Sequence, residues 1–279
     1  MMFRSFLISA LFCLPCGTVW ADYPGDPERA KMLGDYVSGS YARYLNDPRA
    51  QSRFFQGSFE NAPEDVRLGR LALYSALFSD DQKLALQTAR KLYKTDNSES
   101  MARAVLAVDA FSKGRSARVR RYASDPTVDF TMGLAMQIVL GWNQIDEGRY
   151  EAARETFSSL SETEYFGRLG QLQLAKMEGR LGNVEAATEI FDDLELSGVT
   201  ALELTLARAR FEAANGMKER ARARLQTLID DNSAAQIGPA GEYLDRLKQG
   251  KRLPRLSERA EAARALTDPA FSFFVRNKS

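Results

Sequence analysis

The sequence contains no histidine among its 279 residues, and histidine is the side chain that most often serves as a general base or as a transition-metal ligand. Its two cysteines, Cys13 and Cys16, both lie near the N-terminus. The rest of the chain therefore offers no disulfide, zinc–thiolate site or cysteine nucleophile. Glycine-rich phosphate-binding motifs and the Ser-x-x-Lys pattern of histidine-free acyl enzymes are also absent. We therefore expect no catalytic, metal-binding or cofactor-binding residues.

Neither sign of charge is in large excess, because the sequence contains 38 basic and 37 acidic residues. Loss of a cleaved segment over residues 1–21 would remove Arg4 and no acidic residue, and the formal charge would then be zero. Nucleic-acid binding needs a basic excess to neutralise phosphates. The charge balance therefore disfavours a nucleic-acid partner.

Long hydrophobic runs are scarce, and the single strong one follows Arg4. It extends from Phe6 to Cys16 and is too short for a bilayer span, which needs about 20 residues. Val19-Trp20-Ala21 then fits a signal-peptidase site. We expect a secretory signal peptide over 1–21, followed by a lead-in over 22–31.

This N-terminal segment has two other interpretations. An uncleaved membrane anchor is disfavoured because the run is short and Pro15 interrupts it. Lipid attachment at Cys16 is a weaker alternative, because Pro15 stands where a small residue is expected. The favoured interpretation predicts a soluble mature chain in the periplasm, or alternatively in the medium.

Residues of one kind recur at intervals of thirty-four along the chain, which is the signature of a repeat protein. Glycines mark the interval between predicted helices, where a helix C-terminus favours glycine. Small residues mark sites of close helix approach, and a bulky apolar residue follows one turn after the second small series. The three series are Gly114, Gly148, Gly182 and Gly216; Ala107, Gly141, Ala175 and Ala209; and Ala153–Phe157, Ala187–Phe191 and Ala221–Leu225.

These spacings resemble the tetratricopeptide-repeat (TPR) family, and the fourth repeat matches best, with Leu140-Gly141, Gly148, Tyr150, Ala153 and Phe157. The resemblance implies an all-α, right-handed superhelical solenoid of antiparallel helix pairs. It divides the chain into six TPR-like repeats over 32–233, C-terminal capping helices over 234–267 and a tail over 268–279. Asp125-Pro126 breaks the third repeat, so its second helix should be short.

A narrower resemblance concerns three short stretches, Leu106–Phe111, Gly250–Pro254 and Ala260–Leu266. They are similar to segments of longer exported TPR proteins of alphaproteobacteria. This resemblance implies relatives with further repeats, so the chain would be a shortened version of such proteins.

The family resemblance also implies a concave groove lined by the first helix of each repeat. A protein or peptide partner with apolar anchors and an acidic end would suit this groove, because its middle is aromatic and its C-terminal end is basic. A phase error of one residue would instead place several of these side chains in the core. The predicted groove residues are Arg70, Tyr74, Phe78, Phe111, Trp142, Ile145, Lys176, Arg180 and Arg210.

Two rival functions rest on charged residues. A basic cluster (Lys113, Arg115, Arg118, Arg120 and Arg121) could bind cell-wall polymer or an anionic lipid surface, although a solvated helix face is the more ordinary explanation. Carboxylate pairs such as Asp192-Asp193 and Asp230-Asp231 are the remaining catalytic option, but both lie near predicted helix ends. The sequence therefore favours an exported, non-catalytic adaptor or scaffold.

Overall fold

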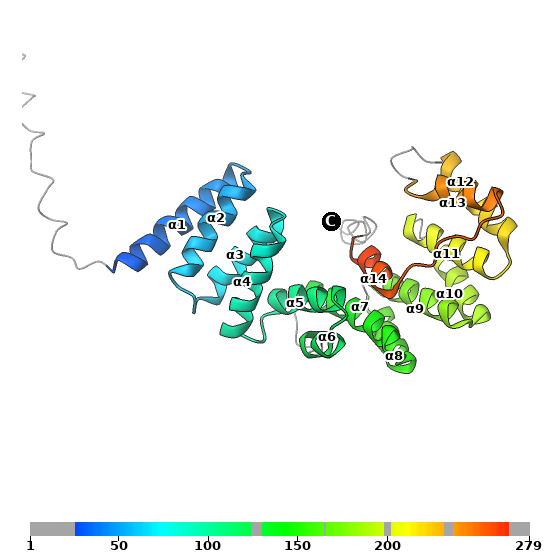
Figure 1. The fold of residues 1–279 in the computed structure, drawn as a ribbon, viewed down its shortest axis with the longest axis horizontal. Helices are drawn as coiled ribbons and strands as arrows, with labels where there is room; N and C mark the ends of the chain where they lie inside the picture. The colour runs from blue at the N-terminus through cyan, green and yellow to red at the C-terminus, as the bar shows by residue number, and fades with distance from the viewer. Residues whose placement is uncertain (1–25, 124–129, 165, 198–201, 232–236, 268–279) are drawn as a thin grey trace, which may run out of the picture. The chain divides into compact units, whose positions relative to one another are not determined.

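The computed structural model describes residues 26–123, 130–164, 166–197, 202–231 and 237–267. Every regular element in these ranges is an α-helix, as predicted (Figure 1). The predicted signal peptide and the tail over 268–279 lie outside the described residues. The helices are α1 (Pro27–Tyr44), α2 (Pro48–Glu60), α3 (Val66–Phe78), α4 (Gln82–Thr95), α5 (Ser100–Ser112), α6 (Ser116–Ala123), α7 (Phe130–Asp146), α8 (Tyr150–Ser161), α9 (Gly167–Leu181), α10 (Val184–Leu196), α11 (Leu202–Ala214), α12 (Lys218–Asp231), α13 (Ala240–Lys248) and α14 (Glu258–Thr267).

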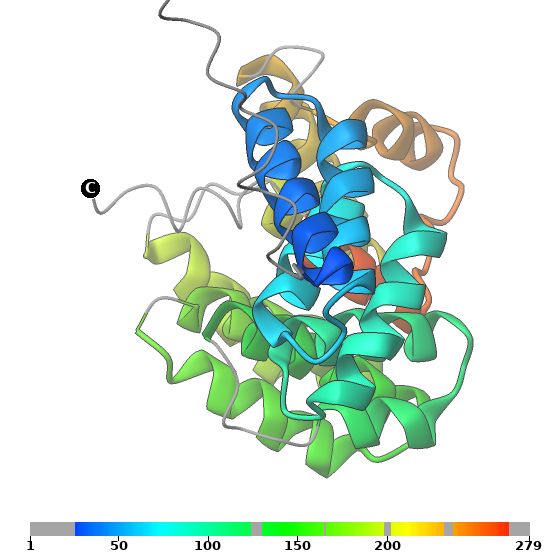
Figure 2. The ribbon, with the colours of Figure 1, turned by 90° about the vertical axis from the view of Figure 1, so that its left-hand side faces the viewer.

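The chain divides into two compact units, which are described separately. Unit 1 (Met1–Thr95) contains α1 to α4, and unit 2 (Asp96–Ser279) contains α5 to α14. Within each unit consecutive helices pack as pairs; in unit 1, α1 and α2 run side by side in both views (Figures 1 and 2). The sequence predicted a single run of six repeats and gave no sign of this division.

Aspartates begin the first three helices of unit 1. The carboxylate of Asp26 accepts a hydrogen bond from the backbone N–H of Glu28 at 3.0 Å, and Asp47 accepts one from Ala50 at the same distance. Asp65 caps α3 in the same way. Such caps satisfy backbone donors that have no partner inside the helix, so they fix where each helix starts.

The turn inside each helix pair has one recurring backbone conformation. The predicted glycine series, Gly114, Gly148, Gly182 and Gly216, has φ values of 65°, 73°, 86° and 84°. These left-handed values suit glycine, which has no Cβ to clash.

The same conformation extends the series in both directions at the same thirty-four-residue interval. It occurs at Asn46 and Asp80, both with φ of 59°, and at Gly250 with φ of 73°. Asn and Asp are the non-glycine residues that best tolerate it. Because α13 precedes Gly250 as α11 precedes Gly216, α13 is the first helix of a seventh repeat.

The small and bulky series predicted from the sequence form the cores of the helix pairs in unit 2. Ala153, Ala187 and Ala221 are buried, as are Phe157, Phe191 and Leu225 one turn later. A Cβ atom on Gly141 would overlap the ring of Phe157, so only glycine allows α7 and α8 to approach this closely. The predicted short helix is α6, with eight residues.

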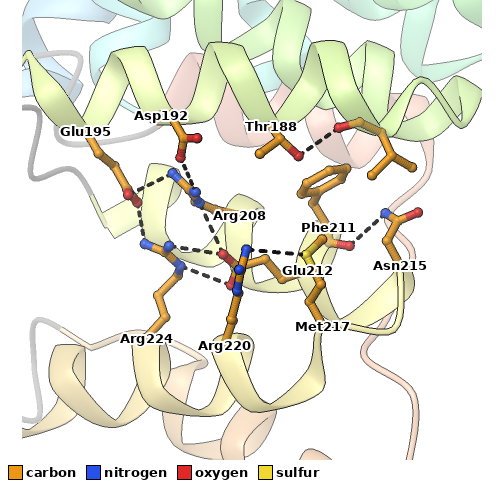
Figure 3. Close-up of polar contacts among 11 residues, drawn as sticks. Thr188, Asp192, Glu195, Arg208, Phe211, Glu212, Asn215, Met217, Arg220 and Arg224 are labelled. Carbon is orange, nitrogen blue, oxygen red and sulfur yellow. Dashed lines mark hydrogen bonds and ion pairs between the residues drawn. The ribbon is translucent and has the colours of Figure 1, made fainter.

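An ion-pair network joins α10, α11 and α12 (Figure 3). Arg208 on α11 pairs with Asp192 and with Glu195 of α10, the latter at 2.7 Å. Arg224 on α12 pairs with the same Glu195 and, at 3.0 Å, with the buried Glu212 of α11. The network links one repeat to the next through side chains that are partly removed from water.

The last two helices of unit 2, α13 and α14, pack against different parts of the unit. α13 packs against α12 and ends the stack of pairs. The following segment, 251–257, contains no helix, and α14 packs against α7 rather than against α13 (Figure 1). The sequence predicted both helices as caps over 234–267, but α14 lies against the middle of unit 2.

Candidate partner-binding surface

The first group of predicted groove residues lies on α3 in unit 1 and is exposed. Tyr74 is 51% exposed and Phe78 is 57% exposed. Their rings stack, with centroids 6.2 Å apart and an interplanar angle of 7°. Arg70 lies one turn before Tyr74 and is also exposed. α3 therefore presents an aromatic surface beside a cation, which is a composition common at binding hot spots. That a partner binds there stays a prediction.

The second group of predicted residues is buried in unit 2 and cannot line an open groove. Phe111, Trp142 and Ile145 all belong to one hydrophobic core. The Trp142 indole donates a hydrogen bond to the Gln173 side chain at 3.0 Å, and its ring lies 5.8 Å from that of Phe157. Exposure of these three side chains, which the groove interpretation required, is wrong.

A contact distant in sequence contributes to this core. Ala262 and Ala265 of α14 belong to the same core as Phe111 and Trp142. A second contact fixes its position: the Arg259 guanidinium donates to the backbone carbonyl of Phe111 at 3.0 Å. Repeat periodicity describes packing between neighbours and contains no information on a helix that returns from the end of the chain.

The third group, Lys176, Arg180 and Arg210, faces α14 and meets its acidic residues. Lys176 lies 3.2 Å from the carboxylate of Glu261, and Arg210 lies 3.4 Å from its other oxygen. Arg180 pairs with Glu258 and donates to the carbonyl oxygen of Leu256 at 2.8 Å. These three cations lie together, as the prediction of a basic groove end required, but a segment of the same chain occupies the space before them.

Five charged side chains form a cluster at the centre of this contact, and all of them except Arg264 are buried: Lys176, Glu203, Arg210, Glu261 and Arg264. Glu203 of α11 is shared by three cations, at 2.7 Å from Lys176 and 3.2 Å from each arginine. Burial alone would raise the pKa of Glu203, but the positive charges of Lys176 and Arg210 outweigh it and lower the pKa to about 2. Glu203 is therefore ionised whenever this cluster is assembled at neutral pH.

The sequence analysis missed Glu203, Glu258 and Glu261 as parts of this site. One signal was available: Glu258, Glu261, Ala262 and Ala265 share one face of the predicted C-terminal helix, at positions i, i+3, i+4 and i+7. A face of acids and alanines is too polar for a cap that stacks on apolar helices. It has the acidic character that we predicted for a groove ligand.

Several of the charged residues on which the rival functions rest form pairs with other side chains. Lys113 pairs with Asp109 and Arg120 with Glu147, whereas Arg115, Arg118 and Arg121 are exposed. Of the candidate acids, Asp192 pairs with Arg208, and Asp230 accepts a hydrogen bond from Gln226 at 2.8 Å. The described ranges contain no group of three or more potential ligands that could hold a metal ion. Nor do they contain a helix with the length and apolar character needed to cross a bilayer.

Solved structures resemble this chain over most of its length. A tetratricopeptide repeat protein from Parabacteroides merdae ATCC 43184 matches with a TM-score of 0.64, covering 89% of this chain and 95% of its own, at 15% identity. The fold is that of the TPR proteins. PilW, a type IV pilus biogenesis factor, matches with a TM-score of 0.55 over 76% of this chain and 97% of its own, at 13% identity. No protein-family model and no curated protein matches the sequence.

The TPR fold gives the helices distinct positions in each repeat. All of the predicted groove residues lie on the first helices of their pairs, which are α3, α5, α7, α9 and α11. The TPR fold therefore places these residues on equivalent helices. In unit 2, α14 then covers the inner side of α7 and meets the cations of α9 and α11.

Proposed function

We propose that this chain is an exported, non-catalytic adaptor that binds a protein or peptide partner through the exposed face of α3. The observation that supports this most strongly is the stacked pair Tyr74 and Phe78, with Arg70 one turn away. Two large aromatic rings held in one orientation lose little conformational entropy on binding, so they are efficient anchors for apolar side chains of a partner. The TPR fold, whose general role is protein interaction, supports the same conclusion.

The cellular setting is part of the proposal. The predicted signal peptide over 1–21 supports export to the periplasm, or alternatively secretion. The fold shared with PilW, a type IV pilus biogenesis factor, supports a role in the assembly of other proteins. Cell fractionation with detection of the mature chain tests the location: recovery of a full-length chain from the cytoplasm would contradict export.

The binding surface can be tested by crosslinking in intact cells followed by capture of the chain. The double substitution Tyr74→Ala and Phe78→Ala should lower the captured partner about tenfold or more, because it removes both anchors. Tyr150→Ala is a matched control, since Tyr150 is an exposed tyrosine on α8, a second helix of unit 2. Equal capture by the double variant and by the control would rule out α3 as the binding surface.

A second candidate function is binding of cell-wall polymer or anionic lipid through the basic cluster. It is favoured by the exposure of Arg115, Arg118 and Arg121. Sedimentation with peptidoglycan or anionic liposomes at low and high salt would test it, because exposed charges are screened by salt. Arg118→Glu with Arg121→Glu should abolish sedimentation, whereas sedimentation unaffected by salt and by both substitutions would contradict this function.

A further inference from the structure

α14 occupies the inner side of unit 2 as a ligand would. It reaches α7 through the non-helical segment 251–257, and it contacts side chains of α9 and α11 (Figure 1). Its contacts include both classes that a bound peptide would make. Ala262 and Ala265 enter the hydrophobic core, while Glu258 and Glu261 meet cations of the inner helices.

The surface beneath α14 is cationic. Without the two acids of α14, Lys176 and Arg210 would keep only Glu203 of this cluster, and Arg180 would lose the carboxylate of Glu258. A segment with acidic side chains is therefore needed to balance this surface when water is excluded from it. Even with α14 in place, one terminal nitrogen of Arg210 is buried without a hydrogen-bond partner among the described residues. α14 thus leaves a donor that another occupant could satisfy.

The apolar contact that holds α14 is small. Its buried apolar side chains are two alanines, with Leu266 partly buried, whereas the pair α7 and α8 buries Trp142 and Phe157. Ten residues are too few to form a stable helix without support. Removal of four of these charges from water offsets part of the attraction between them.

We propose that α14 is an exchangeable occupant, and that the inner surface of α7, α9 and α11 binds an amphipathic helix of a partner in its place. The partner helix carries acidic residues three apart, with small apolar residues on the same face, as in Glu258, Glu261, Ala262 and Ala265. The partner helix then competes with α14 of the same chain for this surface. Only a partner with this pattern of residues displaces α14. The proposal does not depend on the aromatic surface of α3.

Hydrogen–deuterium exchange of the native full chain tests whether α14 opens on its own. Its backbone amides should exchange at least tenfold faster than those of α7 and α9, because local opening requires less free energy than unfolding of the core. Exchange of α14 at the rate of α7 and α9 would overturn the proposal, since α14 would then be an integral part of the core.

Binding of a labelled synthetic peptide with the sequence of residues 255–267 tests the partner chemistry. The opened variant Ala265→Arg alters only α14, at a buried position, and should bind this peptide at least tenfold more tightly than the native chain does. Ala263→Arg is the matched control, because Ala263 is exposed on the same helix; it should bind as the native chain does. A second peptide with Glu258→Lys and Glu261→Lys should not bind the opened variant. Equal binding of both peptides, or of neither, would overturn the proposal.

If Ala265→Arg unfolds unit 2, competition in the native chain decides instead. An excess of the same peptide, isotopically heavy so that its fragments differ in mass, should raise exchange at α14 and lower it at α9 and α11. The charge-reversed peptide should have neither effect. No change with the native-sequence peptide would overturn the proposal.

Discussion

Asp80 occupies a left-handed backbone conformation that glycine occupies at the five later positions of the series. An L-residue pays for this conformation with a steric clash of its Cβ, although Asp and Asn suffer least. We expect Asp80→Gly to stabilise unit 1 by about 0.5–1 kcal/mol. Chemical denaturation followed by circular dichroism would measure the change.

The reciprocal substitution tests the same cause in unit 2. Gly182 has φ of 86°, and a Cβ there would meet no neighbouring atom, so any loss comes from the backbone alone. Gly182→Ala should lower the free energy of unfolding by about 1–2 kcal/mol. If neither substitution changed the free energy of unfolding, the left-handed conformation would carry no steric cost at these turns.

Glu203 gives the buried cluster a defined response to acid. Its pKa falls from a usual value of 4.5 to about 2 in the folded chain. A lowered pKa stabilises the fold above the unfolded pKa, and this contribution is lost as the pH falls from about 4.5 to 2. We expect a loss on the order of 3 kcal/mol from this residue over that interval.

Denaturation between pH 5 and pH 2 would test this dependence. Glu203→Gln should lower stability at neutral pH, because Lys176 and Arg210 lose a shared anion, and should flatten the decline in acid. Glu189→Gln, at an exposed acid of α10, should leave the decline as it is in the native chain. Parallel declines in the Glu203→Gln variant and the native chain would contradict the role of Glu203.

At the level of single residues, the sequence predicted the positions where residue type follows from local geometry. The glycines at 114, 148, 182 and 216 were found because the turn selects glycine. Asn46 and Asp80 were missed because these residues are also common on ordinary surfaces. The entry of α14 into the core that contains Trp142 could not be predicted, since α14 follows Trp142 by about 120 residues.

At the level of helices, Arg208 of α11 forms the ion pairs that link α11 to α10. It pairs with Asp192, Glu195 and Glu212, and its own side chain is only 9% exposed (Figure 3). Arg208→Ala should destabilise unit 2 by about 3 kcal/mol, because it leaves partly buried acids short of a partner. Thermal or chemical unfolding would measure this loss.

A surface ion pair provides the contrast. Glu219 pairs with Arg222 but is 82% exposed, and such pairs contribute little. Glu219→Gln should change the free energy of unfolding by less than about 0.5 kcal/mol. Equal effects of the two substitutions would show that the network in Figure 3 adds nothing beyond ordinary surface charge.

The helices themselves were largely predictable, whereas the place of one of them was not. The break at Asp125-Pro126 correctly predicted the short helix α6. The C-terminal helix was expected within the capping region 234–267 and occurs at Glu258–Thr267. Its packing against α7 depends on pairs such as Lys176 with Glu261, which no local pattern reveals.

At the level of the whole molecule, the two units should respond separately to damage. In a repeat protein each repeat contacts mainly its neighbours, so a local defect spreads over a limited distance. Phe59 is buried in unit 1, and Phe59→Ala should lower stability there by about 3–5 kcal/mol. Hydrogen–deuterium exchange should then accelerate in α2 to α4 and stay unchanged in α9 and α10.

Phe157→Ala should have the opposite pattern, because Phe157 is buried between α7 and α8 of unit 2. Acceleration throughout the chain in both variants would mean that the units unfold as one. The division near Thr95 could not be predicted, because the thirty-four-residue interval continues across it from Asp80 to Gly114.

The unbroken spacing of the left-handed turns has a consequence for how such a chain can change in length. Each turn from Asn46 to Gly216 stands at the same phase of its helix pair, and Gly250 follows α13 at the same interval. A gain or loss of thirty-four residues between any two of them joins equivalent positions of equivalent helices. Any number that is not a multiple of thirty-four shifts the later helices out of the register of the repeat. Growth and shortening by whole modules are therefore the steps that this architecture tolerates best.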